Sequence, residues 1–133
     1  MTLFLARQAK EVIGFEIVKV AVEDALRNSV RNGIGNARFI QSNLEKTLDD
    51  ESLPVPDVVV VDPPRAGLLG SAVQNTLSLG AKRIIYVSCN PTTQARDSVA
   101  FNQGGYKLKS MTLVDMFPHT PHVETIGVFE PGN

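Results

Sequence analysis

The sequence predicts an α/β three-layer fold: helices on a mostly parallel sheet, with an antiparallel pair of strands at the end of the chain. Short apolar runs rich in β-branched residues alternate with segments of helical periodicity, which is typical of strands joined by helical crossovers. One run, Asp57–Asp62, is continuously apolar between its two aspartates, as a parallel strand buried on both faces requires. The last quarter of the chain instead contains two extended segments with no helical pattern between them.

The first predicted strand is Val12–Phe15, and a helix follows it. Small and apolar residues recur at helical spacing from Val18 to Ser29, with charged residues between them. Asn32 and Gly33 then supply a typical helix stop.

Three more strands are predicted from apolar, β-branched runs. They are Ala37–Ile40, Asp57–Asp62 and Arg83–Val87. A helical stretch near Ser71–Leu79 separates the second of these from the third, so these two strands are expected to be parallel.

The remaining chain predicts one helix and then the antiparallel pair. The helix is expected to start at Thr92 or Thr93, just after Pro91. Tyr106–Val114 and His122–Phe129 form the two extended segments, joined by a proline-containing turn.

Length and composition predict a single domain over residues 1–133, with a net charge of −1 that excludes a strongly basic nucleic-acid-binding domain. A local basic patch remains compatible with this charge. The single cysteine, Cys89, excludes an intrachain disulfide and fits a reducing compartment such as the cytoplasm. The apolar runs are strand-sized, so no membrane span is expected.

In sheets of this class, functional residues collect at the carboxyl ends of the strands. Glu16 directly follows the first predicted strand. A carboxylate at this position can accept hydrogen bonds from both hydroxyls of a nucleotide ribose. The competing interpretation is a solvated glutamate in a loop.

A second candidate, Asp62-Pro63-Pro64-Arg65, follows the buried valine run. The two prolines fix the backbone and remove two N–H donors. Such a stiff loop can present an acid and carbonyl oxygens to a planar base. The competing interpretation is a tight turn that leaves the strand.

The third candidate is Cys89, in Ser88-Cys89-Asn90-Pro91 after the next strand. A thiol between a strand end and a helix start can act as a nucleophile, although free cysteines are commonly small buried apolar residues. Consecutive strands commonly lie side by side. Cys89 and the Asp62 loop are therefore expected to face one crevice.

Two histidines and a glutamate lie near the C-terminus. His119 and His122 are three residues apart, but the spacing offers no third ligand, so we expect no metal site. Glu124 begins the last extended segment beside the turn. Taken alone, it would be interpreted as an exposed glutamate on an edge strand.

Val61–Leu68 combined with Tyr86–Pro91 resembles the S-adenosylmethionine-dependent RNA 5-methyluridine (uracil-C5) methyltransferases. That family modifies uridines in transfer RNA and large-subunit ribosomal RNA. Three further stretches are similar to it: Val12–Val18 followed by Ala21–Ala25, Asn32–Phe39, and Asp115–Pro118 with His122–Thr125. The resemblance implies a Rossmann-like class I methyltransferase fold, with S-adenosylmethionine as cofactor and RNA as partner.

The resemblance also implies roles for individual residues. Cys89 matches the nucleophile that attacks uracil C6, Glu124 matches the base that removes the C5 proton, and Asp62 matches the acid that holds the uracil edge. Glu16, Asn43 and Asp62 are expected at the cofactor. The expected substrate contacts are Pro63, Pro64 and Arg65.

One departure from the family pattern is at the N-terminus. Thr2–Arg7 resembles the helix that follows the first strand and glycine-rich loop of the fold, and no glycine precedes Gly14. We therefore expect that strand and loop to be missing. The strands at Val12–Phe15 and Asp57–Asp62 would then pair directly, or self-association or a partner chain would fill the gap.

Two other functions fit part of the pattern. The chain alone could be an inactive or split fragment that folds or binds a partner without catalysing methylation. Asp62-Pro63-Pro64 also fits exocyclic-amine methyltransferases, but these need an aromatic residue after the prolines and no nucleophilic cysteine. Arg65 and Cys89 argue against that second function.

Overall fold

The computed structural model describes residues 1–42, 53–68 and 70–132. The chain divides into two compact units, Met1–Lys46 and Thr47–Asn133.

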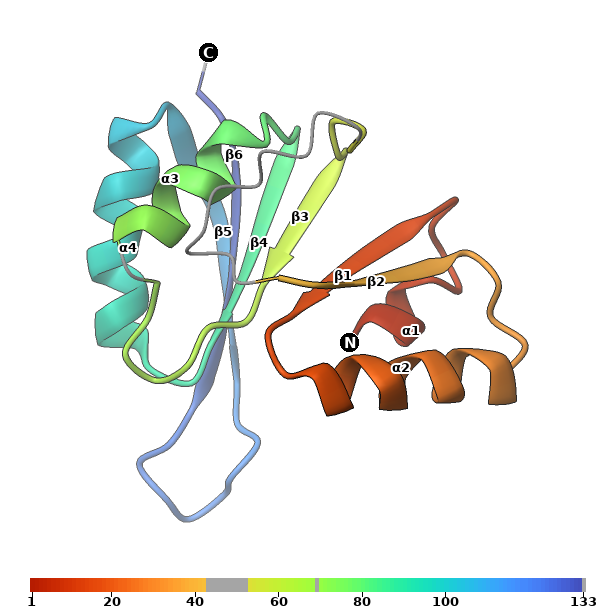
Figure 1. Ribbon diagram of the computed structural model, residues 1–133. Coiled ribbons are helices and arrows are strands. Elements are labelled where there is room, and N and C mark those ends of the chain that lie inside the picture. The colour runs from red at the N-terminus through yellow and green to blue at the C-terminus, as the bar shows by residue number, and fades with distance from the viewer. Residues whose placement is uncertain (43–52, 69, 133) are drawn as a thin grey trace. The chain divides into compact units, whose positions relative to one another are not determined.

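The first unit contains a two-stranded parallel sheet. Its elements are α1 (Thr2–Leu5), β1 (Val12–Glu16), α2 (Lys19–Arg31) and β2 (Ala37–Gln41). The two strands pair in register along their whole length, and α2 packs along them (Figure 1). The strands and helix predicted for this part of the chain are confirmed.

The helix stop predicted after α2 is also confirmed. Asn32 caps the helix, and its backbone N–H donates to the carbonyl oxygen of Asn28 at 3.1 Å. Gly33 follows with a φ of +64°, in the left-handed region that glycine adopts without steric cost. The buried Ser29 hydroxyl donates to the Ile34 carbonyl at 2.5 Å and fixes the chain's exit towards β2.

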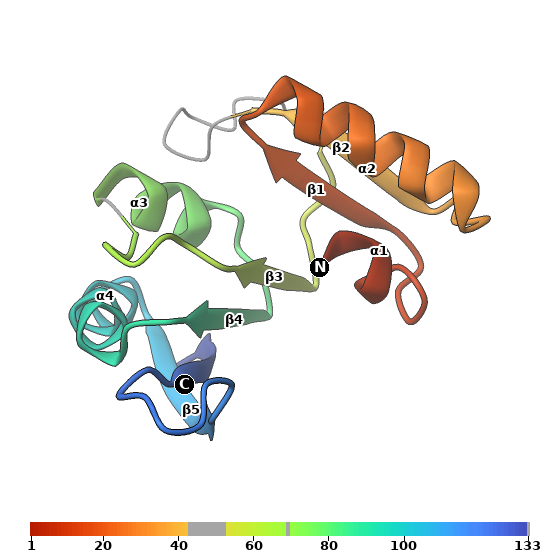
Figure 2. The same cartoon turned by 90° about the horizontal axis from the view of Figure 1, so that it is seen from below.

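The second unit contains a four-stranded mixed sheet in the order β3-β4-β6-β5. β3 and β4 are parallel, whereas β6 is antiparallel to both of its neighbours. Helices α3 and α4 lie on one side of this sheet (Figures 1 and 2). The elements are β3 (Val58–Val61), α3 (Gly70–Ser78), β4 (Arg83–Ser88), α4 (Pro91–Gln103), β5 (Tyr106–Val114) and β6 (Glu124–Pro131).

Several predicted boundaries in this unit are shifted by one or two residues. α4 begins at Pro91 rather than at Thr92 or Thr93, because Asn90 is the capping residue and accepts the N–H of Thr92 at 3.1 Å. The last strand begins at Glu124 rather than at His122.

Aromatic side chains form the core between the four-stranded sheet and α4. Phe101 of α4 packs edge-on against Tyr86 of β4, with ring centroids 6.1 Å apart, and against Phe129 of β6 at 5.1 Å. All three are fully or almost fully buried, as is Ile84. Edge-to-face pairs add to the burial energy, so this cluster holds α4 against the middle of the sheet.

The strand pairs bear on the expected gap. In the part of the chain that the structure describes, β1 belongs to a two-stranded sheet and β3 to a separate four-stranded one. Direct pairing of Val12–Phe15 with Asp57–Asp62, and filling of the gap by self-association or a partner chain, both stay predictions. No helix in the described ranges is long and apolar enough to cross a membrane.

Candidate active site

The pairing of β4 with β6 carries Cys89 and Glu124 to the same end of the sheet. Ser88, the last residue of β4, pairs with Thr125 near the start of β6. Cys89 directly follows β4, and Glu124 is the first residue of β6. Both residues are half-buried. They are far apart in the sequence, and the antiparallel register brings both to the same end of the sheet.

Asp62 leaves the sheet at that same end. Val61, the last residue of β3, pairs in parallel with Tyr86 of β4, so Asp62 leaves the sheet one residue before the level at which β4 ends at Ser88. Its side chain is exposed to solvent. The expectation that the Asp62 loop and Cys89 come from neighbouring strands is confirmed.

A tight hydrogen-bonded turn holds Cys89 between β4 and α4. The backbone N–H of Asn90 donates to the Ser88 hydroxyl at 3.1 Å, and that hydroxyl is 3.0 Å from the Asn90 carbonyl oxygen. The Asn90 side chain caps α4. The turn therefore presents Cys89 from a fixed backbone at the N-terminal end of the helix.

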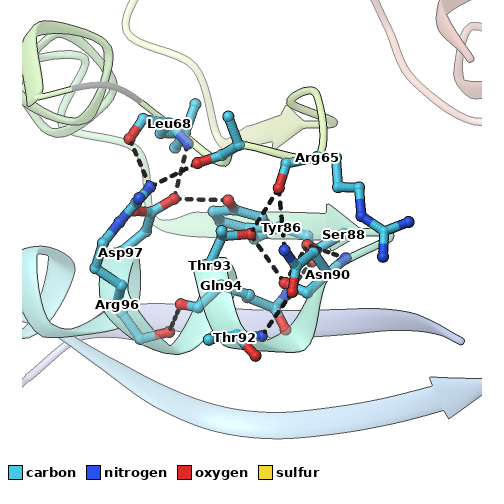
Figure 3. Close-up of polar contacts among 12 residues, drawn as sticks. Arg65, Leu68, Tyr86, Ser88, Asn90, Thr92, Thr93, Gln94, Arg96 and Asp97 are labelled. Atoms are coloured by element: carbon cyan, nitrogen blue, oxygen red, sulfur yellow. Dashed lines mark hydrogen bonds and ion pairs between the residues drawn. The ribbon is translucent and has the colours of Figure 1, made fainter. Parts of the chain in front are cut away.

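The loop after β3 is held by the same helix (Figure 3). The Arg65 carbonyl oxygen accepts from the Asn90 amide at 3.2 Å and from the Thr93 hydroxyl at 3.3 Å. Further along, the Leu68 N–H donates to the Asp97 carboxylate at 2.7 Å. The loop that contains Pro63 and Pro64 is thus attached to the helix that starts beside Cys89.

Gln94 makes a second connection, from α4 to β4 and β6. Its amide nitrogen donates to the Tyr86 carbonyl at 2.9 Å, and its amide oxygen accepts the Thr125 hydroxyl at 2.8 Å. Gln94 is fully buried, so these bonds satisfy polar groups that would otherwise be costly. Thr125 immediately follows Glu124, which places Glu124 beside a fixed point of the backbone.

The Tyr86 hydroxyl completes this polar region by donating to Asp97 at 2.8 Å. Burial, followed by the hydrogen bond and the charge of Asp97, raises the pKa of Tyr86 above its ordinary value. Tyr86 therefore remains a neutral hydrogen-bond donor over the whole physiological range.

Comparison with known proteins identifies the family. The sequence profile described as tRNA (Uracil-5-)-methyltransferase matches residues 45–130, which is more than half of the chain. The chain belongs to the tRNA (uracil-5-)-methyltransferase family.

Individual members are similar over nearly the whole chain. A Pseudomonas aeruginosa protein, the 23S rRNA (uracil(1939)-C(5))-methyltransferase RlmD, is 45% identical over 98% of this chain and 29% of its own length. An RNA methyltransferase of Chlorobaculum tepidum is 43% identical, again over 98% of the chain and 28% of its length. The chain therefore spans less than a third of these curated relatives.

Solved structures give the same fold. A Pyrococcus abyssi tRNA (uracil-54, C5)-methyltransferase in complex with S-adenosyl-L-homocysteine has a TM-score of 0.79 and 36% identity, and it covers 96% of this chain and 30% of its own. A Streptococcus pneumoniae putative tRNA (m1A22) methyltransferase has a TM-score of 0.75 at 16% identity, over 98% of this chain and 57% of its own. The fold expected from the sequence, that of class I methyltransferases, is confirmed.

Two residues that the uracil-5-methyltransferase resemblance assigned to the cofactor lie outside the four-stranded unit. Glu16 ends β1, is half-buried, and accepts the Val18 backbone N–H at 2.9 Å. This bond orients the carboxylate and leaves it further lone pairs, because an ionised carboxylate has about four acceptor sites. Asn43 lies outside the described residues.

The two histidines lie in the exposed loop between β5 and β6. His119 has a φ of +69°, which is uncommon for a residue other than glycine. Within the described ranges, no group of three or more His, Cys, Asp or Glu side chains could hold a metal ion.

The polar side chains of α4 that bind the β3 loop were not predicted from the sequence. They are Asn90, Thr93, Arg96 and Asp97. Asn90, Thr93 and Asp97 recur at three- to four-residue spacing in the sequence, but a polar face on a helix ordinarily indicates exposure to solvent. Only the position of the loop shows that this face is covered.

Proposed function

We propose that this chain is the catalytic part of an RNA uracil-C5 methyltransferase, acting on ribosomal or transfer RNA with S-adenosylmethionine as methyl donor. The observation that carries the proposal is the strand register by which Asp62, Cys89 and Glu124 leave the sheet at one end. We take residues 1–133 as part of one catalytic domain and the cytoplasm as its place of action.

The reaction requires a nucleophile because C5 of uracil is a weak one. In the proposed first step, the Cys89 thiolate adds to C6 of the uracil, and the electron pair of the C5–C6 double bond moves towards C5 and the neighbouring carbonyl oxygen. C5 can then form its bond to the methyl group. Covalent catalysis of this kind divides one difficult substitution into an addition and an elimination.

The second half of the reaction requires a base. Glu124 is proposed to take the proton from methylated C5, and the C–H electron pair restores the C5–C6 double bond. The bond between C6 and the Cys89 sulfur breaks, and the thiolate is regenerated. The half-buried carboxylate at the same end of the sheet as Cys89 supports this role.

Base recognition is proposed for the loop after β3. Asp62 would hold the polar edge of the uracil, with Pro63, Pro64 and Arg65 as further substrate contacts. A uridine must leave its stack to reach such a site. The attachment of Arg65 to α4 supports a loop of fixed shape rather than one that forms only on binding.

S-adenosylmethionine supplies an electrophilic methyl group and leaves as a neutral thioether. Glu16 fits the proposed contact with its ribose, because the Val18 N–H already orients a carboxylate that has acceptor sites to spare. Asp62 and Asn43 are the other proposed cofactor contacts.

The decisive experiment uses two preparations: the chain alone, and a chimera in which the chain replaces the matching segment of the Pseudomonas aeruginosa relative. Each is incubated with uridine-containing RNA and methyl-labelled S-adenosylmethionine, and the nucleosides are analysed. We expect 5-methyluridine from the chimera and none from its Cys89→Ala variant. A folded chimera that makes no 5-methyluridine contradicts the proposal.

A trapped intermediate tests the covalent step separately. RNA with fluorine at C5 of the target uridine has no proton for the base to remove, so the methylated adduct should remain bound through Cys89. A protein–RNA band that survives denaturation is expected with Cys89 and not with Cys89→Ala. Methylation of an exocyclic amine that continues in Cys89→Ala would favour the other class of methyltransferase.

The same preparations separate the enzyme from an inactive fragment. Calorimetry of the chain alone with S-adenosylmethionine should detect micromolar binding if the chain holds the proposed cofactor contacts. If the chimera methylates RNA whereas the chain alone neither binds cofactor nor methylates, the chain is a split fragment that depends on the remaining sequence.

A further inference from the structure

One face of α4 holds the loop that leaves β3. The N-cap Asn90 is followed at helical spacing by Thr93 and Asp97, with Arg96 next to Asp97. Each of the four bonds to the backbone of residues 65–68 (Figure 3). We name these four side chains the α4 clamp. Together they engage the carbonyl oxygens of Arg65, Ala66 and Leu68 and the N–H of Leu68.

Asp97 is the buried centre of the α4 clamp. Its side chain is 2% exposed, whereas that of Arg96 is 56% exposed. One Asp97 oxygen accepts both the Leu68 N–H at 2.7 Å and the Tyr86 hydroxyl at 2.8 Å. The other accepts two bonds from the Arg96 guanidinium, at 2.7 and 2.9 Å. The carboxylate thus links α4, the β3 loop and the middle of β4.

The loop backbone lies very close to this carboxylate. Gly67 is buried with a φ of +81°, and a Cβ atom there would be 2.6 Å from both the Asp97 oxygen and the Arg96 Nη2. Real Cβ contacts are essentially never this short. The loop backbone and the α4 clamp therefore fit each other closely at Gly67, with no room for a side chain between them.

Stability alone gives a weak account of this carboxylate. The ion pair of Asp97 with Arg96 adds little net stability, because the Arg96 side chain is 56% exposed and water screens the attraction between the charges. The aromatic cluster of Tyr86, Phe101 and Phe129 already attaches α4 to the sheet. What Asp97 adds is a fixed distance between the β3 loop and the helix that begins beside Cys89.

We infer that Asp97 is a positioning residue that sets the place of the Asp62–Arg65 loop relative to Cys89. The inference rests on the proposed function, in which that loop holds the uracil and Cys89 attacks it. Asp97 contacts neither reacting group and acts through the Leu68 N–H and the Tyr86 hydroxyl. A misplacement of about 1 Å can reduce a rate by about 100-fold, so the α4 clamp matters for catalysis.

The first test measures the loop without requiring catalysis. Asp97→Asn keeps the size of the side chain and removes its charge. The matched control is Asp57→Asn, which breaks an exposed ion pair with Lys82 next to the opposite end of β3. Hydrogen exchange is followed along the chain, and iodoacetamide alkylation reports on Cys89, the chain's one thiol.

In Asp97→Asn we expect the Leu68 amide to exchange at least ~10-fold faster, with a much smaller change in β4 and β6. The alkylation rate of Cys89 should change by at least about threefold as the loop loosens. Asp57→Asn should change neither. Uniformly faster exchange with unchanged alkylation overturns the inference. If Asp97→Asn does not fold, Thr93→Val, which removes one hydroxyl from the α4 clamp, must show the same local pattern.

The second test uses the chimera with the fluorinated RNA as an active-site titrant. Per titrated site, Asp97→Asn should lower kcat by about 10- to 100-fold at a temperature where the protein is fully folded. A merely structural role would lower Tm and leave kcat per site unchanged, which overturns the inference. Inactivity of the chimera with the unmodified chain counts against the proposed function, whereas the exchange and alkylation results still decide whether the loop is positioned by Asp97.

Discussion

The two glutamates near the ends of β6 have different surroundings, which suit them to different chemical roles. Glu124 is half-buried at the end of the sheet where β4 runs into Cys89, whereas Glu130 lies at the far end of the strand and accepts two bonds from Arg83, at 2.5 and 2.9 Å. The same side chain on the same strand is thus a candidate base at one end and an ion-pair partner at the other.

Glu124→Gln should therefore stop the reaction after methyl transfer. The amide cannot take the C5 proton, so the adduct with ordinary RNA should accumulate and product release should slow by about 10²- to 10⁴-fold. Denaturing gels of the chimera with labelled RNA measure both quantities. Glu130→Gln is the matched control and should behave like the unmodified protein. Rapid release of product by Glu124→Gln would assign the base to another residue.

Tyr86 gives a prediction about stability and pH. Its pKa is raised in the folded protein, chiefly by burial, so the folded state keeps the proton after the unfolded chain has lost it. The contribution of Tyr86 is fully present below about pH 10, the pKa of an unfolded tyrosine, and is lost as the pH rises above it.

Above pH 10, the free energy of unfolding should fall by up to about 1.4 kcal/mol per pH unit more in the unmodified chain than in Tyr86→Phe. Urea unfolding between pH 8 and pH 11 measures the difference. Equal slopes for the two proteins would mean that Tyr86 does not stay protonated in the fold.

At the scale of elements, α4 combines two kinds of contact. Its aromatic residue Phe101 packs on β4 and β6, and its polar face binds the loop after β3. The sequence predicts this helix and both neighbouring strands, but a polar face gives no indication of a covering loop. The order of the strands was also not predicted, because β6 returns between β4 and β5 only when the chain is folded.

The close fit of loop and helix leads to a prediction for Gly67→Ala. The left-handed φ costs roughly 1–2 kcal/mol for alanine, and the clash with Asp97 and Arg96 adds to this cost. The free energy of unfolding should therefore fall by about 2–4 kcal/mol. Gly80→Ala is the matched control, with a φ of +62° and nothing within 4 Å of the added atom. Its free energy of unfolding should fall only by the cost of the left-handed φ. If urea unfolding shows equal decreases for the two variants, the loop moves aside and the clash costs nothing.

At the scale of the whole molecule, the buried apolar side chains are unevenly distributed. Within the described residues, Ala6 is the one buried hydrophobic residue of the first unit, and the others lie in the second unit. Burial of apolar surface is the main favourable contribution to folding. The two units should therefore differ in local stability.

We expect the amides of β1 and β2 to exchange at least ~10-fold faster than those of β4 in the chain alone. Hydrogen exchange with mass spectrometry at pH 7 measures this directly. Similar protection in both units would contradict the prediction and would indicate one cooperative unit of folding.

The core of the second unit gives a complementary prediction. Phe129→Ala removes a ring that is 1% exposed, which should cost about 3–5 kcal/mol. Phe117→Ala, at a ring that is 54% exposed, is the control and should change stability by less than about 0.5 kcal/mol. Urea unfolding distinguishes them. If Phe129→Ala lowers the free energy of unfolding only slightly, the surrounding side chains can fill the space left by the ring.

The sequence by itself determined the strands, the helices, the fold class and the family resemblance, because hydrophobic periodicity, prolines and glycines act within a few residues along the chain. It also singled out Asp62, Cys89 and Glu124 as candidates. Only the tertiary structure decided that β6 pairs with β4 in the register that brings Glu124 and Cys89 to the same end of the sheet, and that Asp97 is buried beside the β3 loop. Strand register and the covering of a polar face depend on contacts between distant segments, and these exist only in the folded chain.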